Sequence, residues 1–300
     1  MYMKKYILLF CIVFSPLLVV AQEAQHILKL WQGNTFVEYN IDNIDSITFE
    51  TQFPQPEYIG EFSVSSNKKV SFSPGNLMYI PASDAWIFAA NQYDYIGTRN
   101  LVNKEFADTI DLFAWSTDSS PLSAWGVTLL EEDSLFSGNF VDWGTALGED
   151  SPWRTLTSKE WEYLRASRKN AAKLIGIGSI NGIHGLILLP DNWQAPEGIT
   201  FQSGYSSKEY SSVAFEEYQS FTLDQWATMQ AAGAVFLPCA GFRMGTTLAY
   251  MQLGGMYWTS SINSSYGTRF AHYFLFMCDG AGMGTDTRWN GNAVRLVRDL

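Results

Sequence analysis

The run GNAVRLVRDL, Gly291–Leu300, places two arginines among apolar residues. The Gly-Asn pair at its start predicts a turn, and the residues after it predict a β-strand. Successive side chains of a strand point to opposite faces. This alternation puts Val294, Leu296 and Arg298 on one face, and Ala293, Arg295 and Val297 on the other. Neither face is cleanly polar, so we expect the closing strand of a buried sheet.

Three apolar segments precede this strand after residue 233: AVFLPCAGFR, GGMYWTSSI and RFAHYFLFMC. Gly, Asn and Ser separate them, which is typical of turns between strands. Four strand-like segments in series predict one antiparallel sheet. Earlier short β runs are KVSFSP, NLMYIP and AWIFAA, and residues 97–151 show little periodicity.

Two helices are signalled by capping boxes, in which a Thr is followed three residues later by Glu or Gln. The first box consists of Thr157 and Glu160, and we expect Trp161, Leu164 and Ala171 or Leu174 to form the buried face of the helix that begins after Thr157. The second follows Thr222 and Gln225, with Leu223, Trp226 and Met229 on its buried face and Gly233 as its stop.

The chain divides into four parts by composition. Residues 1–21 contain Lys4 and Lys5, an apolar stretch and a small residue at Ala21, which predicts a cleaved secretory signal. Residues 22–52 predict a small β unit with a third strand at SITFE, 46–50. Residues 53–57 contain two prolines and predict a linker. Residues 58–300 form the main domain.

The overall composition and net charge limit the kinds of function that the chain can have. Hydrophobic residues make up 47% of the 300 residues, which indicates a globular chain. Loss of Lys4 and Lys5 with the signal changes the net charge from −11 to −13. An acidic exported chain disfavours nucleic acid and anionic membrane surfaces as partners. No second apolar run is long enough to span a membrane, so we expect a cell-surface, extracellular or periplasmic protein.

The ordered set WRTLTSKEWEYL, LILLPDNW, AVFLPCAGFR, GMYWTSS, YFLF and GNAVRLVRD resembles one family. It is the sulfatase-modifying (formylglycine-generating) version of the C-type lectin fold, in secreted bacterial proteins. The resemblance runs from about Lys69 to Leu300. It implies an α+β, C-type-lectin-like domain of short antiparallel strands, two helices and much irregular loop, preceded by the small N-terminal β segment.

The chemistry of that family does not transfer to this chain. Formylglycine-generating enzymes hold copper with two nearby cysteines late in the domain, whereas Cys239 and Cys278 are far apart here. The sugar-binding calcium tripeptides of C-type lectins are also missing; Trp289-Asn290-Gly291 lacks the final Asp. We therefore expect no cofactor and no metal, and lean against an enzyme. The residues leave open whether the two cysteines form a disulfide or remain buried thiols.

The two arginines of the last run receive structural roles. A guanidinium buried in a sheet requires a carboxylate or several carbonyls as partners. The resemblance suggests that Arg295 is structural, and we expect Glu162 on the first helix to be its partner. Arg298 is expected at the rim, near Asp299.

The best place for a ligand is the pair of late loops, 262–270 and 279–291, because function concentrates in loops held by a rigid sheet. The candidate ligand-binding residues are Tyr266, Arg269, Asp279, Asp286, Arg288 and Trp289. The alternative is that Trp289 packs onto the sheet. We expect a non-catalytic binding or adhesion module for a glycan or a cell-surface protein.

Two other functions stay open. One is a glycan-active enzyme, which would need two facing carboxylates; the chain offers Asp108, Asp111, Asp118, Glu131 and Asp142 without a spacing that selects a pair. The other is a structural surface or fimbria-like subunit, assembled through the N-terminal β unit.

Overall fold

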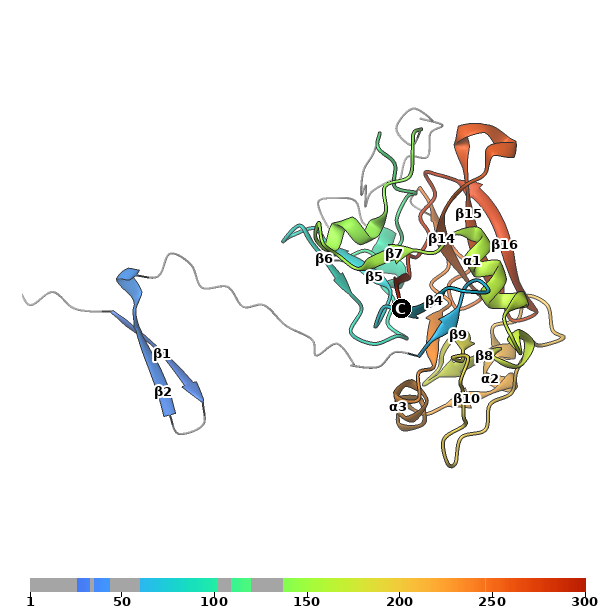
Figure 1. Cartoon of the computed structure of the whole chain (residues 1–300), viewed down its shortest axis with the longest axis horizontal. Coiled ribbons are helices and arrows are strands. Elements are labelled where there is room, and N and C mark those ends of the chain that lie inside the picture. Colours follow the sequence, from blue (N-terminus) through green and yellow to red (C-terminus); the bar gives the residue numbers. More distant parts are fainter. Residues whose placement is uncertain (1–25, 33–34, 44–59, 102–108, 120–136, 246) are drawn as a thin grey trace, which may run out of the picture. The chain divides into compact units, whose positions relative to one another are not determined.

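The computed structural model describes residues 26–32, 35–43, 60–101, 109–119, 137–245 and 247–300 (Figure 1). Contacts divide the chain into two compact units, Met1–Gln52 and Phe53–Leu300. The described residues form a mixed α+β structure that is rich in strands and has three α-helices. The predicted α+β class is confirmed at this level.

The described part of the N-terminal unit is a two-stranded hairpin. Strand β1 (Ile27–Gln32) pairs antiparallel with β2 (Thr35–Asn40), and a 3-10 turn (Ile41–Asn43) follows. The register runs from Ile27 opposite Asn40 to Gln32 opposite Thr35. The predicted signal, residues 1–21, and the predicted third strand, 46–50, lie outside the described residues.

The described residues of the second unit form five small sheets. Its strands are β3 (Phe62–Ser63), β4 (Lys69–Phe72), β5 (Leu77–Ile80), β6 (Ala85–Phe88), β7 (Trp153–Thr155), β8 (Ile175–Ile180), β9 (Ile183–Leu188), β10 (Ser220–Phe221), β11 (Val235–Pro238), β12 (Phe242–Met244), β13 (Thr247–Ala249), β14 (Gly254–Ile262), β15 (Phe270–Met277), β16 (Gly280–Thr287) and β17 (Leu296–Asp299). Their orders are β3-β4-β17-β7, β10-β8-β9-β11, β14-β15-β16, β5-β6 and β12-β13.

The prediction of one sheet from the four late segments is wrong. Strand β11 pairs with β9, strands β14 and β15 pair with each other, and β17 lies between β4 and β7. Apart from the β14–β15 ladder, the described parts of these segments are joined by isolated bridges, Gly241–Gly255, Arg243–Gly291 and Tyr257–Ala293. Periodicity predicts that a segment is a strand, but the partner is chosen by tertiary packing.

The helices begin where the capping boxes predict. At the start of α1 (Ser158–Glu162), the Thr157 side chain accepts a hydrogen bond from the Glu160 backbone N–H, and the Glu160 side chain accepts one from the Thr157 backbone N–H. Thr222 and Gln225 do the same at α3 (Leu223–Ala231). The remaining helical elements are α2 (Val213–Tyr218), the π turn η4 (Tyr163–Ser167), and the 3-10 turns η2 (Gly97–Leu101), η3 (Trp143–Leu147), η5 (Ala171–Lys173) and η6 (Ser264–Arg269). Helix α2 was not predicted.

The buried faces of these helices match the predictions except at one residue. Trp161, Leu164, Ala171 and Leu174 are buried, as are Trp226 and Met229 of α3. Leu223 is 44% exposed, so its predicted burial is wrong. It is the first residue of α3, and the first turn of this helix presents it to solvent. Gly233 has φ +93°, which suits its predicted role as the helix stop.

The last run is buried on both faces because it lies between two hydrophobic clusters. Ala293 and Val297 join the cluster that contains Trp161 of α1 and Phe274 of β15. Val294 and Leu296 join the tryptophan-rich cluster, which contains Trp115, Trp143 and Trp258. The predicted alternation is confirmed, and it explains why neither face is polar.

Arg295 is buried as predicted, with 1% of its surface exposed, but its predicted partner is wrong. Its guanidinium donates to Gln92 Oε1 at 2.7 Å and to Asn76 Oδ1 at 3.5 Å. Glu162 instead binds Arg165 one helical turn later, at 2.5 Å. Arg295 is thus held by neutral amide oxygens, and burial lowers its pKa to about 10.

Arg298 is half-buried, and its guanidinium lies 5.7 Å from the Trp153 ring. The neighbouring Asp299 binds Lys68 and Arg154 instead. The aromatic contact therefore holds Arg298, while Asp299 belongs to a separate charged network.

Candidate functional site

A pocket of about 550 Å³ lies where the end of β16 meets the β12–β13 hairpin. Its lining residues are Met244, Gly245, Thr247, Asp286, Thr287, Trp289 and Asn290. The two walls are tied together by backbone pairing between Arg243 and Gly291, whose N–H groups each donate to the other's carbonyl at 2.8 Å. The pocket is therefore built on paired backbone.

A tight turn after β16 sets the polar side of this pocket. The Asn290 backbone N–H donates to the Thr287 carbonyl at 3.0 Å. Asp286 Oδ1 accepts the Thr287 backbone N–H at 2.8 Å and Asn290 Nδ2 at 2.7 Å. These bonds fix the carboxyl and the amide against each other, and Asn290 is buried.

The pKa of the Asp286 carboxyl is raised above its ordinary value of 3.8. Burial raises the pKa of this carboxyl, while hydrogen bonds from Thr287 and Asn290 act in the opposite direction. A carboxyl that is half-buried in a pocket has hydrogen-bonding capacity in either protonation state. Asp286 is thus equipped to bind hydroxyl groups.

Trp289 supplies the aromatic side of the pocket. Its side chain is half-buried and lines the pocket, and the Arg269 guanidinium lies 6.0 Å from its ring. That distance is at the outer limit of a cation–π contact. The Arg269 carbonyl also accepts the Arg288 backbone N–H at 3.0 Å, so the end of η6 is tied to this turn.

Arg288 does not line the pocket and is buried elsewhere. Its guanidinium lies 4.4 Å from the Trp115 ring and donates to the Gly138 carbonyl at 3.1 Å. The side chain is fully buried, so the structure gives it a packing role. The structure therefore places Arg288 outside the candidate ligand-binding site, contrary to the prediction from the sequence.

Asp279 lies far from the pocket, because residues 279–291 are not a long loop. Residues Gly280–Thr287 form β16, which pairs with β15 along its whole length. Asp279 is exposed in the turn before β16 and Asp286 is near its other end. Seven residues of strand separate them by roughly 23 Å. The side chain of Tyr266 lies outside the described residues.

Cys239 and Cys278 are free thiols, and both are buried in the same hydrophobic cluster. The Cys278 thiol donates to the Lys208 carbonyl at 3.0 Å. Burial, and to a lesser degree the Cys278 thiol, raises the pKa of Cys239 well above its usual range. The structure therefore contains the thiol form, the second of the two alternatives left open by the sequence.

The candidate catalytic carboxylates have structural partners where they are described. Asp111 is fully buried and binds Asn100 and the Ile96 backbone N–H. Asp118 binds Asn139, and Asp142 caps η3. Asp108 and Glu131 lie outside the described residues. Within the described ranges, His, Cys, Asp and Glu form no group that could hold a metal ion.

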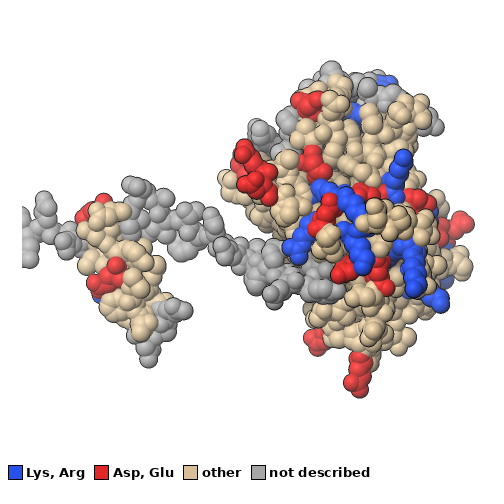
Figure 2. Space-filling model, viewed as in Figure 1, with Lys and Arg blue, Asp and Glu red and all other residues tan. Residues whose placement is uncertain are grey.

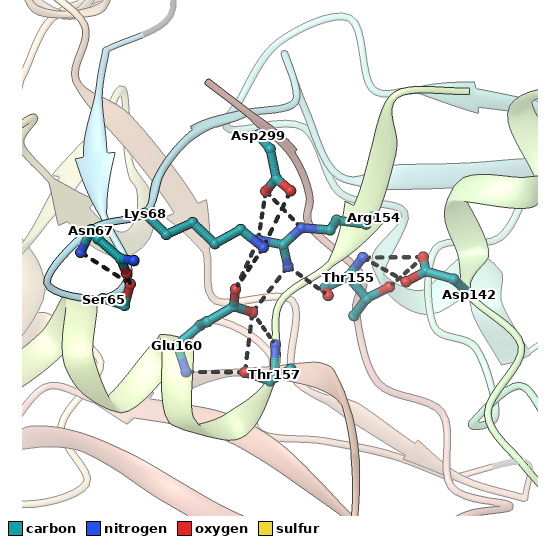
Figure 3. A network of polar contacts seen from close by, with 9 residues as sticks. All are labelled: Ser65, Asn67, Lys68, Asp142, Arg154, Thr155, Thr157, Glu160 and Asp299. Atoms are coloured by element: carbon teal, nitrogen blue, oxygen red, sulfur yellow. Dashed lines mark hydrogen bonds and ion pairs between the residues drawn. The ribbon is translucent and has the colours of Figure 1, made fainter. Parts of the chain in front are cut away.

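A charged network joins four segments of the main unit (Figure 3). The Arg154 guanidinium grips the Glu160 carboxylate with two bonds of 2.9 and 2.8 Å, and it also lies 2.7 Å from Asp299. Lys68 approaches Asp299 at 3.2 Å and Glu160 at 3.5 Å. Figure 2 shows Lys and Arg gathered with interleaved Asp and Glu on one face of this unit. The two cations and two anions of this network balance each other's charge, so we assign the network a role in stabilising the fold.

Five lining residues of the pocket were not predicted. Thr287 and Asn290 are neighbours of Asp286 and Trp289, so their proximity in sequence was a usable signal. Met244, Gly245 and Thr247 come from a hairpin some 40 residues earlier. No local pattern places that hairpin beside β16.

No family model, curated protein or solved structure matches this chain. Among the residues that the structure describes, no helix has the length and apolarity to cross a membrane.

Proposed function

We propose that this chain is an exported, non-catalytic binding module that takes a carbohydrate in the pocket beside Trp289. The observation that carries the proposal is the convergence of Trp289, Asp286, Thr287 and Asn290 on one pocket with the β12–β13 hairpin. Its volume, about 550 Å³, falls within the range of small-molecule sites.

The chemistry of the lining fits a polyhydroxyl ligand. The Trp289 ring offers an apolar face for the C–H groups of a sugar ring. Asp286, Asn290 and the Thr247 hydroxyl offer hydrogen-bond donors and acceptors for its hydroxyls. A few polar groups around an apolar surface fix the orientation of a bound ligand. Arg269, beside the Trp289 ring, would add affinity for a sugar that carries an acidic group.

The sequence supports the same proposal from a different direction. The predicted signal peptide implies export. The resemblance to the sulfatase-modifying version of the C-type lectin fold implies a scaffold on which late residues host ligands, without the cysteine pair that the oxidase requires. We place the protein among secreted or cell-surface binding modules of that fold.

The test is a glycan array probed with residues 22–300, alongside the Trp289→Ala variant. We expect binding to a defined set of glycans and at least a tenfold loss with Trp289→Ala. Asp286→Asn keeps the size and hydrogen-bonding capacity of the side chain and is expected to change selectivity less than Asp286→Ala does.

The matched control is Tyr210→Ala, which removes an aromatic ring that is 65% exposed and does not line the pocket. This variant should bind as the unmodified chain does. Absence of binding to every glycan, or equal losses for Trp289→Ala and Tyr210→Ala, would refute the proposal.

A further inference from the structure

The carbohydrate pocket lies at the tip of the outward face of the β12–β13 hairpin. Met244 and Thr247 are cross-strand partners on this face, and both line the pocket. The next pair, Arg243 and Leu248, faces the interior, where Arg243 is buried and Leu248 packs on the main hydrophobic cluster. Phe242 is two residues before Met244 on the same strand, so it shares the outward face at roughly 7 Å from Met244. The pocket wall and Phe242 therefore belong to one surface.

An aromatic pair stands on this surface beside the pocket. The Phe242 and Tyr250 rings are stacked, with their centroids 5.8 Å apart and an interplanar angle of 25°. We call these two residues the aromatic platform. Tyr250 is 38% exposed, and Met244, between the platform and the pocket, is 43% exposed. Accessible apolar surface thus extends from the Trp289 ring in the pocket, past Met244, to the platform.

Tyr273 on β15 gives independent evidence that the platform is close to the polar side of the pocket. Its ring lies over Gly284 of β16, where a Cβ would come within 2.5 Å of the ring carbon Cζ. Asp286 is two residues after Gly284, on the same face of the sheet. Burial raises the pKa of the Tyr273 phenol, and Asp286 and Tyr250 add to the rise. Because interactions between charges more than about 10 Å apart are largely screened, both side chains lie near this phenol.

The backbone of Tyr250 holds the ring in place at a conformational cost. Its φ is +60°, in the left-handed region that disfavours bulky residues. The Tyr250 carbonyl accepts the backbone N–H groups of Leu253 and Gly254, both at 2.9 Å, and these bonds fix the turn. Strained residues of this kind concentrate at ligand-binding sites.

We propose that the pocket binds one sugar of an oligosaccharide and that the next sugar ring stacks on Tyr250 of the platform. The inference rests on the proposed carbohydrate function and assigns its ligand class, a chain of sugars. The step of two strand residues from Met244 to Phe242 is comparable with the length of one sugar ring. An aromatic ring that is stacked on one side and partly exposed offers a flat apolar surface for the C–H groups of such a ring.

The first experiment measures how affinity depends on the length of the glycan. The probes are the terminal monosaccharide, the disaccharide and the trisaccharide of the glycan that binds most strongly on the array, titrated into residues 22–300 by calorimetry. We expect the Kd to fall about tenfold from the monosaccharide to the disaccharide, as one added aromatic contact allows.

The variants separate the two subsites. Tyr250→Asn removes the ring and suits the left-handed backbone, so it should lose the gain with the disaccharide and keep the monosaccharide Kd unchanged. Tyr250→Phe retains the ring and should keep the gain. Trp289→Ala should weaken the binding of every probe, the monosaccharide included.

Saturation-transfer NMR of the unmodified chain with the disaccharide gives a reading that needs no variant. Protons of both sugar rings should receive saturation from the protein, and saturation of one ring alone would contradict the inference. An equal Kd for all lengths, a gain that persists in Tyr250→Asn, or a loss of monosaccharide binding in Tyr250→Asn would overturn it, while the loss in Trp289→Ala would still support the proposed function. Absence of binding to every glycan on the array would refute both.

Discussion

Removal of the Glu160 charge tests the network of Figure 3. The carboxylate accepts two bonds from Arg154 and the Thr157 backbone N–H at 2.8 Å, and only 14% of its side chain is exposed. Burial opposes ionisation of Glu160, but the bonds from Arg154 and Thr157 outweigh it and lower the pKa below its ordinary value of 4.5. Glu160→Gln keeps the size and the capping ability while it removes the charge.

The magnitude follows from what each variant removes. Hydrogen bonds to charged groups contribute about 1.5–3 kcal/mol. Arg154 retains Asp299 as a partner, so we expect Glu160→Gln to lower the free energy of unfolding by about 2 kcal/mol. Glu160→Ala also removes the capping-box contact and should cost about 1 kcal/mol more. For a unit of this size, a loss of about 2 kcal/mol lowers the Tm by roughly 4–8 °C.

The assay is thermal and urea unfolding followed by circular dichroism, near neutral pH and again in acid. Because the pKa of Glu160 is lowered in the folded state, its contribution is present above the ordinary pKa and is lost as the pH falls through the folded value. The gap between the unmodified chain and Glu160→Gln should therefore close in acid.

A double-mutant cycle with Arg154→Met isolates the pair. We expect a coupling energy of about 1–2 kcal/mol between the two positions. Equal stability of Glu160→Gln and the unmodified chain at neutral pH, or a gap that persists in acid, would refute the reasoning.

Three further predictions concern stability and reactivity. Burial lowers the pKa of Arg295 to about 10, and Arg295→Met removes the buried charge while it fills the site, so this variant should be as stable as the unmodified chain or more stable by up to about 2 kcal/mol. Arg295→Ala should instead lower the free energy of unfolding by about 2–4 kcal/mol, because it leaves a cavity. Equal losses of stability for the two variants in urea unfolding would contradict this reasoning. Cys239 and Cys278 should resist a thiol reagent in the folded chain and both react after unfolding, and rapid labelling of the folded chain would show that one is accessible. Thr222→Ala should cost about 1 kcal/mol by the loss of the α3 cap, with Thr222→Ser close to neutral as the control.

Local signals explain what the sequence predicted well. A capping box is complete within four residues, so Thr157 and Thr222 located two helix starts correctly. Strand alternation is equally local, and it sorted the side chains of residues 293–297 onto two faces. The partner of Arg295 was not local: Gln92 is some 200 residues away, and nothing near Arg295 distinguishes it from Glu162.

Strand β16 shows where propensity misleads. Its sequence, GAGMGTDT, has three glycines in eight residues and is typical of a loop. It is a strand because β15 offers a pairing partner at every position. The same error led to the wrong prediction that Asp279 lies near Asp286. A loop could bring the two residues together, whereas the extended strand β16 keeps them apart.

The candidate site was predictable only on one side. Asp286 and Trp289 are three residues apart, and any turn at that point keeps them together. The opposite wall depends on the Arg243–Gly291 backbone pair, which joins residues almost 50 positions apart. Such a contact forms through tertiary packing, so neither periodicity nor motif spacing reveals it.

The central place of β17 has a consequence for the order of folding. Strands β3 and β4 are made early, β7 about 80 residues later, and β17 lies between β4 and β7. The sheet therefore cannot close until the chain has been synthesised as far as Asp299, although more than half of its residues are present much earlier. Until then β4 and β7 have exposed edges, which are templates for aggregation.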